Sequence, residues 1–106
     1  MSIRLINEVL DHAPTGLAPL ERLLLVVIAE AADDKTRRCW PGIDVLTRRV
    51  GVGQRQIARV LAQLEKRGYP LRVPSGVDRR GHPVFAARGH RTTYQLPELR
   101  PPKPDT

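Results

Sequence analysis

The amino-acid sequence predicts a mainly α-helical domain with a small β-hairpin. Apolar residues recur at helical spacing in four segments before Gly68 and alternate at strand spacing after it. Glycine and proline separate these segments. A chain of 106 residues, of which 41% are apolar, suits one compact domain. We predict that this domain covers residues 1–96 and that residues 97–106 form a proline-rich tail or linker.

The first two predicted helices cover residues 3–12 and about 19–32. Pro14 and Gly16 end the first helix, and Pro19 suits the first turn of the second. The inward face of the first helix is predicted to contain Ile3, Ile6, Val9 and Leu10. The inward face of the second is predicted to contain Leu20, Leu23, Leu24, Val27, Ile28 and Ala31.

A polar turn over residues 33–38 leads to two further helices, which the glycine pattern places close together. The third covers about residues 42–50 and the fourth covers residues 54–67, with Gly51 and Gly68 as their stops. The residues predicted to point inward are Ile43, Leu46 and Val50 in the third helix, and Ile57, Val60, Leu61 and Leu64 in the fourth.

After Gly68 the sequence predicts a hairpin with a long tip. "PLRV" and "TTYQL" alternate, so that Leu71 and Val73 share a face, as do Thr92, Tyr94 and Leu96. The segment between them is rich in glycine, proline and arginine, and its "PVFAA" predicts a short third strand.

Basic charge is concentrated in the middle of the chain. Residues 48–91 carry eleven Lys or Arg against two Asp or Glu, whereas the whole chain has a formal net charge of +7. Such a concentration favours a polyanionic partner. Arginine outnumbers lysine by fifteen to three, which suits phosphates and guanine edges. Codon bias in a GC-rich genome explains that ratio equally well.

Several function classes find no support in the sequence. Cys39 is the one cysteine, so no internal disulfide or cysteine metal cluster is expected, and the three histidines lack metal-ligand spacing. Neither a signal peptide nor an apolar run of about 20 residues is present. We therefore expect a cytoplasmic protein without enzyme activity, cofactor, metal, membrane or small-molecule partner.

The order of the elements resembles a known family. The resemblance rests on "LAPLERLLLVVIAEAADD" and "CWPGIDVLTRRVGVGQRQIARVLAQLEKRGY", together with the opening "INEVLDHAP". These segments are similar to bacterial winged helix-turn-helix domains of an actinobacterial type, common in regulators and in plasmid or phage proteins. The resemblance covers residues 3–96 and implies three to four helices with a wing of two or three strands. Gly53 and Ala18 depart from the pattern, because relatives usually place Ser or Thr at the first position and Ser at the second.

The fourth helix is the predicted recognition helix. Its side opposite Ile57, Leu61 and Leu64 carries arginine and glutamine separated by small alanines. Arginine reads guanine and glutamine reads adenine in the major groove. The predicted base-reading residues are Gln54, Arg55, Gln56 and Arg59. An ordinary solvated polar face is the competing interpretation.

Other residues are predicted to contact the DNA backbone. The start of the fourth helix, at Gly53, presents free N–H groups to one phosphate, and Gln56 is placed to reach back to the Gly53 N–H. The preceding helix supplies Thr47, Arg48 and Arg49, although an arginine there also complements the helix dipole. The tip over residues 74–91 supplies Arg79, Arg80, His82, Arg88, His90 and Arg91. A basic loop without a fixed partner is the alternative for this tip.

The remaining candidates are predicted to be structural. Trp40 resembles a base-stacking residue, but its position between two helices favours a core anchor whose N–H finds a partner. Tyr94 and Cys39 are also predicted to be buried.

Three functions fit these patterns. The leading interpretation is sequence-specific binding of double-stranded DNA by a transcriptional regulator. The second is the DNA-binding module of a plasmid or phage replication or partition protein, which the proline-rich end suggests. The third is a protein-interaction winged helix that binds no DNA. In that case helix 3–12 docks a partner or forms a homodimer, whereas its plainer role is to cover the core.

Overall fold

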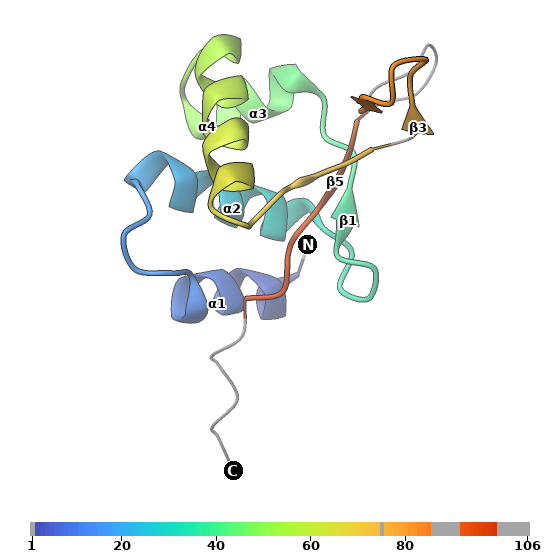
Figure 1. Ribbon diagram of the computed structural model, residues 1–106. Coiled ribbons are helices and arrows are strands. Elements are labelled where there is room, and N and C mark those ends of the chain that lie inside the picture. Colours follow the sequence, from blue (N-terminus) through green and yellow to red (C-terminus); the bar gives the residue numbers. More distant parts are fainter. Residues whose placement is uncertain (1, 75, 86–91, 100–106) are drawn as a thin grey trace.

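The computed structural model describes residues 2–74, 76–85 and 92–99. Figure 1 shows the helices with the strands on one side of them. The elements are α1 (Ile3–His12), α2 (Pro19–Ala31), β1 (Arg38–Cys39), α3 (Ile43–Val50), α4 (Gln54–Lys66), β2 (Arg72–Val73), β3 (Gly76–Val77), β4 (Pro83–Val84) and β5 (Thr93–Gln95). Four helices with a small antiparallel sheet form a winged helix-turn-helix, which confirms the predicted fold class.

Helix α1 has the predicted bounds, but only part of its predicted inward face is buried. Val9 is fully buried and Ile6 packs against the core, whereas Ile3 is 69% exposed and Leu10 is 51% exposed. Leu5, which was not predicted, is fully buried, so the buried face is rotated away from Ile3 and Leu10. Polar contacts accompany this orientation: Ser2 caps the helix, and Glu8 pairs with Arg37, the residue before β1.

Helix α2 lies at the centre of the fold and packs against α1, α3, α4 and β1. Because α2 has neighbours on several sides, its buried residues are not confined to one face of the helix. Leu25 and Ala29 join the core, whereas Leu23 and Ala31, predicted to point inward, are exposed. At its start the Ala18 N–H donates to Glu21 Oε1 over 3.0 Å, which satisfies one of the free donors of the first turn.

Helices α3 and α4 are joined by three residues around a glycine turn. Gly51 ends α3 with φ = 85°, a left-handed conformation that favours glycine. Leu46 and Val50 are buried as predicted, whereas Ile43, at the first position of α3, is exposed. The four predicted inward residues of α4 are all buried: Ile57, Val60, Leu61 and Leu64.

The strands form two small antiparallel sheets. In the first, β5 lies between β1 and β2, with Tyr94 opposite both Cys39 and Arg72. This pairing confirms the predicted hairpin, but β1 falls at the end of the segment predicted to be a turn. In the second, β3 pairs with β4. Strand β4 is the expected short strand in "PVFAA", and its partner β3 was not predicted.

Trp40 is not the core anchor that the sequence suggests. It follows the last residue of β1, on an edge strand, and is 52% exposed. Its indole N–H does find a partner, Thr93 Oγ1 at 2.9 Å. The predictions for Tyr94 and Cys39 are confirmed, because both side chains are buried.

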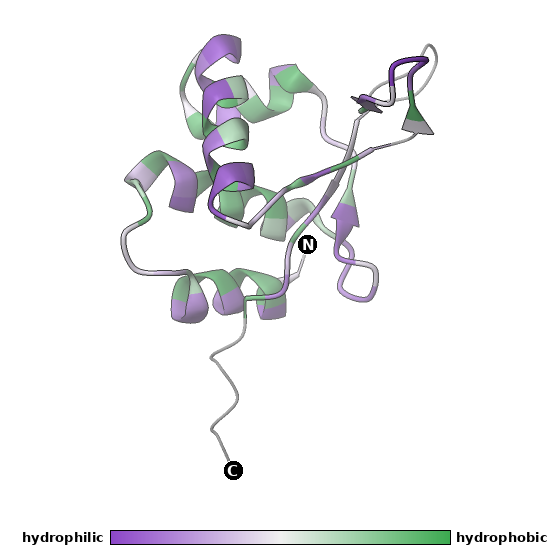
Figure 2. Ribbon diagram, viewed as in Figure 1, coloured by the Kyte–Doolittle hydropathy of each residue, from purple (hydrophilic) through white to green (hydrophobic). Residues whose placement is uncertain are grey.

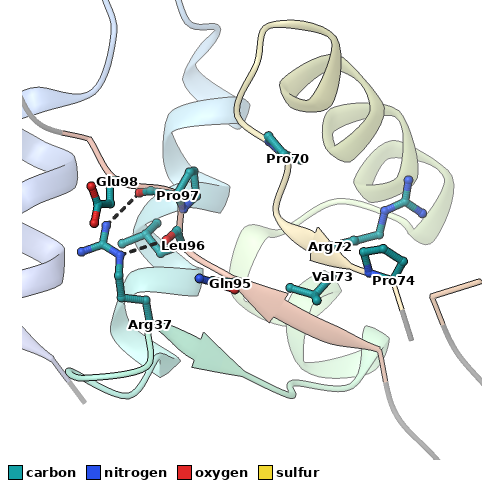
Figure 3. Close-up of a pocket in the computed structure, with 9 residues that line it drawn as sticks. All are labelled: Arg37, Pro70, Arg72, Val73, Pro74, Gln95, Leu96, Pro97 and Glu98. Carbon is teal, nitrogen blue, oxygen red and sulfur yellow. Dashed lines mark hydrogen bonds between the residues drawn. The ribbon is translucent and has the colours of Figure 1, made fainter. Parts of the chain in front are cut away.

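The packed part of the chain extends past β5 as far as Leu99, which is 3% exposed. The buried Arg37 side chain donates to the carbonyl oxygens of Leu96 at 3.0 Å and Pro97 at 2.8 Å (Figure 3). The Leu99 N–H donates to Glu8 on α1. The core therefore reaches beyond the predicted boundary at residue 96.

Candidate nucleic-acid interface

Helix α4 presents a cationic side to the outside of the molecule. Arg55, Arg59, Ala62 and Lys66 are exposed and lie opposite the buried residues of the helix. Figure 2 shows hydrophilic residues along the outer side of α4 and at the turn between β3 and β4. Gln54 is exposed on the side of α4 that faces the strands, and Gln56 is half-buried on the other side. The four predicted base-reading residues therefore lie together in the first two turns, with the arginines in the most outward positions.

The basic side chains fall into two groups by their partners. Five arginines in the described part of the chain lie close to a carboxylate: Arg4 with Asp34, Arg37 with Glu8, Arg49 with Glu30, Arg67 with Glu21, and Arg72 with Glu65. Arg22 and Arg38 donate instead to neutral oxygens.

A second group of cations has no such contact. Within residues 2–74, 76–85 and 92–99, no hydrogen bond or ion pair engages the side chains of Arg48, Arg55, Arg59, Lys66, Arg79 and Arg80, nor that of Lys35 in the turn before β1. Apart from Lys35, these residues lie at the end of α3, on α4 or at the turn between β3 and β4. None of these side chains forms a close ion pair with an acid in the described part of the chain.

The two arginines at the end of α3, Arg48 and Arg49, differ in their contacts. Arg49 Nη1 lies 2.5 Å from Glu30 Oε2 on α2, so this side chain ties α3 to α2. Arg48 is exposed and has no acidic partner among the described residues. The Thr47 hydroxyl donates to the Asp44 carbonyl oxygen one turn earlier, at 3.0 Å. Of the three predicted backbone-contacting residues in α3, Arg48 is the one that is unengaged.

The start of α4 carries backbone donors without a side-chain cap. Gly53 is the N-cap residue, and its backbone is extended, with φ = −74° and ψ = 169°. No side chain in the described chain accepts a hydrogen bond at this cap, and the expected bond from Gln56 to the Gly53 N–H is not formed. The first N–H groups of any helix lack intrahelical acceptors and attract anions. At the start of α4 these N–H groups are uncovered, because the N-cap residue Gly53 has no side chain.

A tight turn organises the hairpin of β3 and β4. The Asp78 carboxylate accepts hydrogen bonds from the backbone N–H groups of Arg80 and His82, at 2.8 and 2.9 Å. Gly81 completes the turn with φ = 81°. Arg79 and Arg80 are exposed at this turn, and His82 Nδ1 lies 3.8 Å from Asp78 Oδ2. The other predicted tip residues, Arg88, His90 and Arg91, lie outside the described residues.

A groove of about 230 Å³ separates α4 from the strands. Gln54, Ala58 and Leu61 line it from the helix, and Arg72 and Phe85 line it from the strands. Sequence reasoning missed Arg72 and Phe85 as members of this surface. Their approach depends on the path of the chain around the hairpin, which carries no periodic signal.

A metal site, a reactive thiol or a membrane-spanning helix would indicate another function for the described residues. No group of three His, Cys, Asp or Glu residues among them could hold a metal ion. Burial raises the pKa of the Cys39 thiol to about 11, with the Glu30 charge as a smaller cause, so the reactive thiolate is disfavoured at neutral pH. None of the described helices is long and apolar enough to cross a membrane.

Comparison with known proteins identifies a family for this chain. The family model "Helix-turn-helix domain" matches residues 15–69, which is just over half of the 106-residue chain. These residues include α2, β1, α3 and α4, and so contain the cationic side of α4. Neither the curated proteins nor the solved structures give a match.

Proposed function

Because the chain belongs to the helix-turn-helix domain family, we propose that it binds double-stranded DNA sequence-specifically through α4. The observation that carries this proposal is the partition of the cations. Arg4, Arg49 and Arg67 each pair with a carboxylate, whereas Arg55 and Arg59 on the outer side of α4 have no acidic partner among the described residues. An ordinary solvated helix face usually mixes both signs of charge, and this one lacks acids in its most outward positions.

The base contacts come from the first two turns of α4 in the major groove. Arg55 and Arg59 read guanine O6 and N7, and Gln54 and Gln56 read adenine N6 and N7. The exposed Ala58 and Ala62 are small, so the helix approaches the bases closely. We expect the preferred site to contain both G·C and A·T pairs.

Backbone contacts fix the helix in the groove. The uncapped N–H groups at Gly53 bind one phosphate, and Arg48 binds a neighbouring one. Thr47 and Arg49 are weaker candidates, because Thr47 donates within α3 and Arg49 is held by Glu30. At the wing, the proposed contacts to phosphates or the minor groove are Arg79, Arg80, His82, Arg88 and Arg91.

A transcriptional regulator in the cytoplasm of a bacterium is the role that we favour for this binding. A replication or partition protein of a plasmid or phage would use the same face of α4. We assign the domain no catalytic role and no cofactor. Ile3 and Leu10 on α1 are exposed, and they offer a surface for a homodimer. Half-sites about 34–36 Å apart would then be expected.

Selection of bound sequences from a random duplex pool tests this function, followed by titration of the selected duplex at several salt concentrations. The logarithm of the affinity should fall linearly with the logarithm of the salt concentration, by about 0.9 for each phosphate neutralised. Arg55→Ala or Arg59→Ala should cost about 1–3 kcal/mol and relax the preference at one base pair. Arg4→Ala is the matched control. It removes an arginine on α1 that pairs with Asp34, and this variant should bind as the wild type does.

Two results would contradict the proposal. An affinity that does not change with salt would exclude the phosphate contacts. Equal losses from Arg4→Ala and Arg55→Ala would show that the outer side of α4 has no special role. If the Arg55→Ala/Arg59→Ala double variant still bound a protein partner fully, and the wild type did not retain DNA, the protein-interaction alternative would be favoured.

A further inference from the structure

One guanidinium group links α4 to the hairpin of β3 and β4. Arg72 lies on β2, and its Nη2 is 3.5 Å from Glu65 Oε2 on α4. Its Cζ lies 4.2 Å from the centre of the Phe85 ring, directly after β4. The same side chain therefore contacts the helix on one side and the end of the hairpin on the other.

The position of this contact matters because α4 carries the proposed base-reading residues and the β3–β4 hairpin carries proposed backbone-contacting residues. Arg72 and Phe85 line the groove between α4 and the strands, opposite Gln54 and Ala58. The start of α4 and the hairpin both lie at the top of Figure 1. The width of the groove sets how far the Arg79 and Arg80 turn stands from the base-reading residues. Strands β3 and β4 pair with each other over two residues each, in a sheet separate from that of β1, β5 and β2.

We propose that Arg72 is a positioning residue for the wing: its stack on Phe85 and its ion pair with Glu65 hold the β3–β4 hairpin at a fixed distance from α4. The proposal rests on the proposed DNA-binding function and deepens it. Arginine suits this task, because its planar guanidinium stacks on an aromatic ring while its edge donates to a carboxylate. Since the ring covers one face of the guanidinium and Glu65 faces its edge, Arg72 itself is not assigned a phosphate.

The first test measures the distance directly and needs no DNA. Nitroxide labels at Ala62→Cys on α4 and Arg80→Cys at the hairpin turn report the separation by pulsed electron resonance. Cys39 is buried, and its raised pKa keeps it out of the labelling reaction at neutral pH. The distance distribution should be narrow in the otherwise wild-type chain and broader with Arg72→Ala or Phe85→Leu. Arg72→Lys keeps a cation against the ring and should restore part of the narrow distribution.

The second test uses the salt dependence of binding to the selected duplex. If the hairpin loses its place, its phosphate contacts are lost, and the slope falls by about 0.9 for each. Phe85→Leu should lower the slope even though it removes no charge. Arg72→Ala should lower it at least as far as the Arg79→Ala/Arg80→Ala double variant does. The triple variant should give the same slope as Arg72→Ala alone, because a displaced hairpin no longer holds Arg79 and Arg80 at phosphates.

Three results would overturn the proposal. The first is an unchanged distance distribution in Arg72→Ala, which applies even if the wild type binds no DNA and the proposed function itself fails. The second is an unchanged salt slope in Phe85→Leu. The third is a triple variant whose slope lies below that of Arg72→Ala by as much as the double variant lies below the wild type, since additive losses would mean that Arg72 does not act through the hairpin.

Discussion

Two glycines in the turn between α3 and α4 differ in what they require. Gly51 has φ = 85°, which is costly for a residue with a side chain, whereas Gly53 has an ordinary extended backbone. A Cβ atom added at Gly53 would meet nothing within 4 Å. Backbone geometry therefore does not demand glycine at Gly53. What the glycine does there is leave the first N–H groups of α4 uncovered.

This difference leads to a prediction for two substitutions at one position. Gly53→Ser and Gly53→Asp both supply a capping oxygen, so each should raise the free energy of unfolding by a few tenths of a kcal/mol or somewhat more. Their effects on DNA should diverge, because the aspartate charge occupies the proposed phosphate site and repels the phosphate. Urea denaturation and duplex titration measure the two effects. If the aspartate variant bound DNA as tightly as the serine variant, the start of α4 would not be part of the interface.

Single residues mark the limits of prediction from the sequence. Arg55 and Arg59 could be placed on the outside of α4, because helical spacing fixes them relative to Ile57, Leu61 and Leu64. Trp40 could not be placed, because its exposure depends on an edge strand of two residues. Such a short strand leaves no alternating pattern to detect.

At the scale of elements, α1 has its predicted bounds but only part of its predicted inward face. Its limits follow from Ser2, Pro14 and a continuous helical period. Its rotation depends on Glu8, whose partner Arg37 lies 29 positions along the chain. Both side chains are about 10% exposed, and Arg37 adopts φ = 63°. The pair connects α1, the turn before β1 and the segment after β5, and none of these distant contacts is visible in a local pattern.

We expect Glu8→Gln to destabilise the fold strongly. The substitution keeps the shape of the side chain but leaves the Arg37 guanidinium buried without its counter-charge. Breaking a buried pair in this way costs about 3–5 kcal/mol. Chemical denaturation measures the loss, and Asp11→Asn on the exposed side of the same helix is the control, with little expected change. Similar stabilities for both variants would mean that α1 is held by apolar packing alone.

At the scale of the whole molecule, the described acids with lowered pKa values are segregated from the arginines on the outer side of α4. Glu8, Asp33 and Asp34 lie on α1 or in the turn after α2, and each has its pKa held below its usual value. The main causes are the Arg37 side chain for Glu8, backbone N–H groups for Asp33, and the Ser2 and Arg4 side chains for Asp34. The first two turns of α4 carry no acid. Fold stability and the proposed DNA binding therefore depend on different charges.

This segregation predicts how stability varies with pH. A carboxyl group with a depressed pKa binds a proton more readily in the unfolded chain than in the folded one. Its contribution is complete above the ordinary pKa, 4.5 for Glu8 and 3.8 for the aspartates, and is lost as the pH falls through the folded value. The urea midpoint should thus be flat from about pH 6 to 8 and fall in acid. The fall should be shallower in Glu8→Gln, and an equally steep fall in that variant would assign the acid sensitivity to other groups.

The order of the helices and the pairing of β2 with β5 could be predicted from the sequence, because each segment has its own hydrophobic period and its own stop residues. The additional strands β1 and β3, the groove beside α4 and the contacts of Arg72 could not. These features depend on contacts between separate segments of the chain. Strands of two residues are too short to give an alternating pattern that would predict such contacts.

The anchoring of Leu99 beside Glu8 decides how the protein can be handled. The chain passes Leu99 next to α1, at the bottom of Figure 1, while the first turns of α4 lie at the top. A bead or sensor surface coupled beside Leu99 would therefore hold the molecule at the end away from the first turns of α4. Immobilised in that orientation, Arg55 and Arg59 would face the bulk solution, where the proposed duplex could approach them.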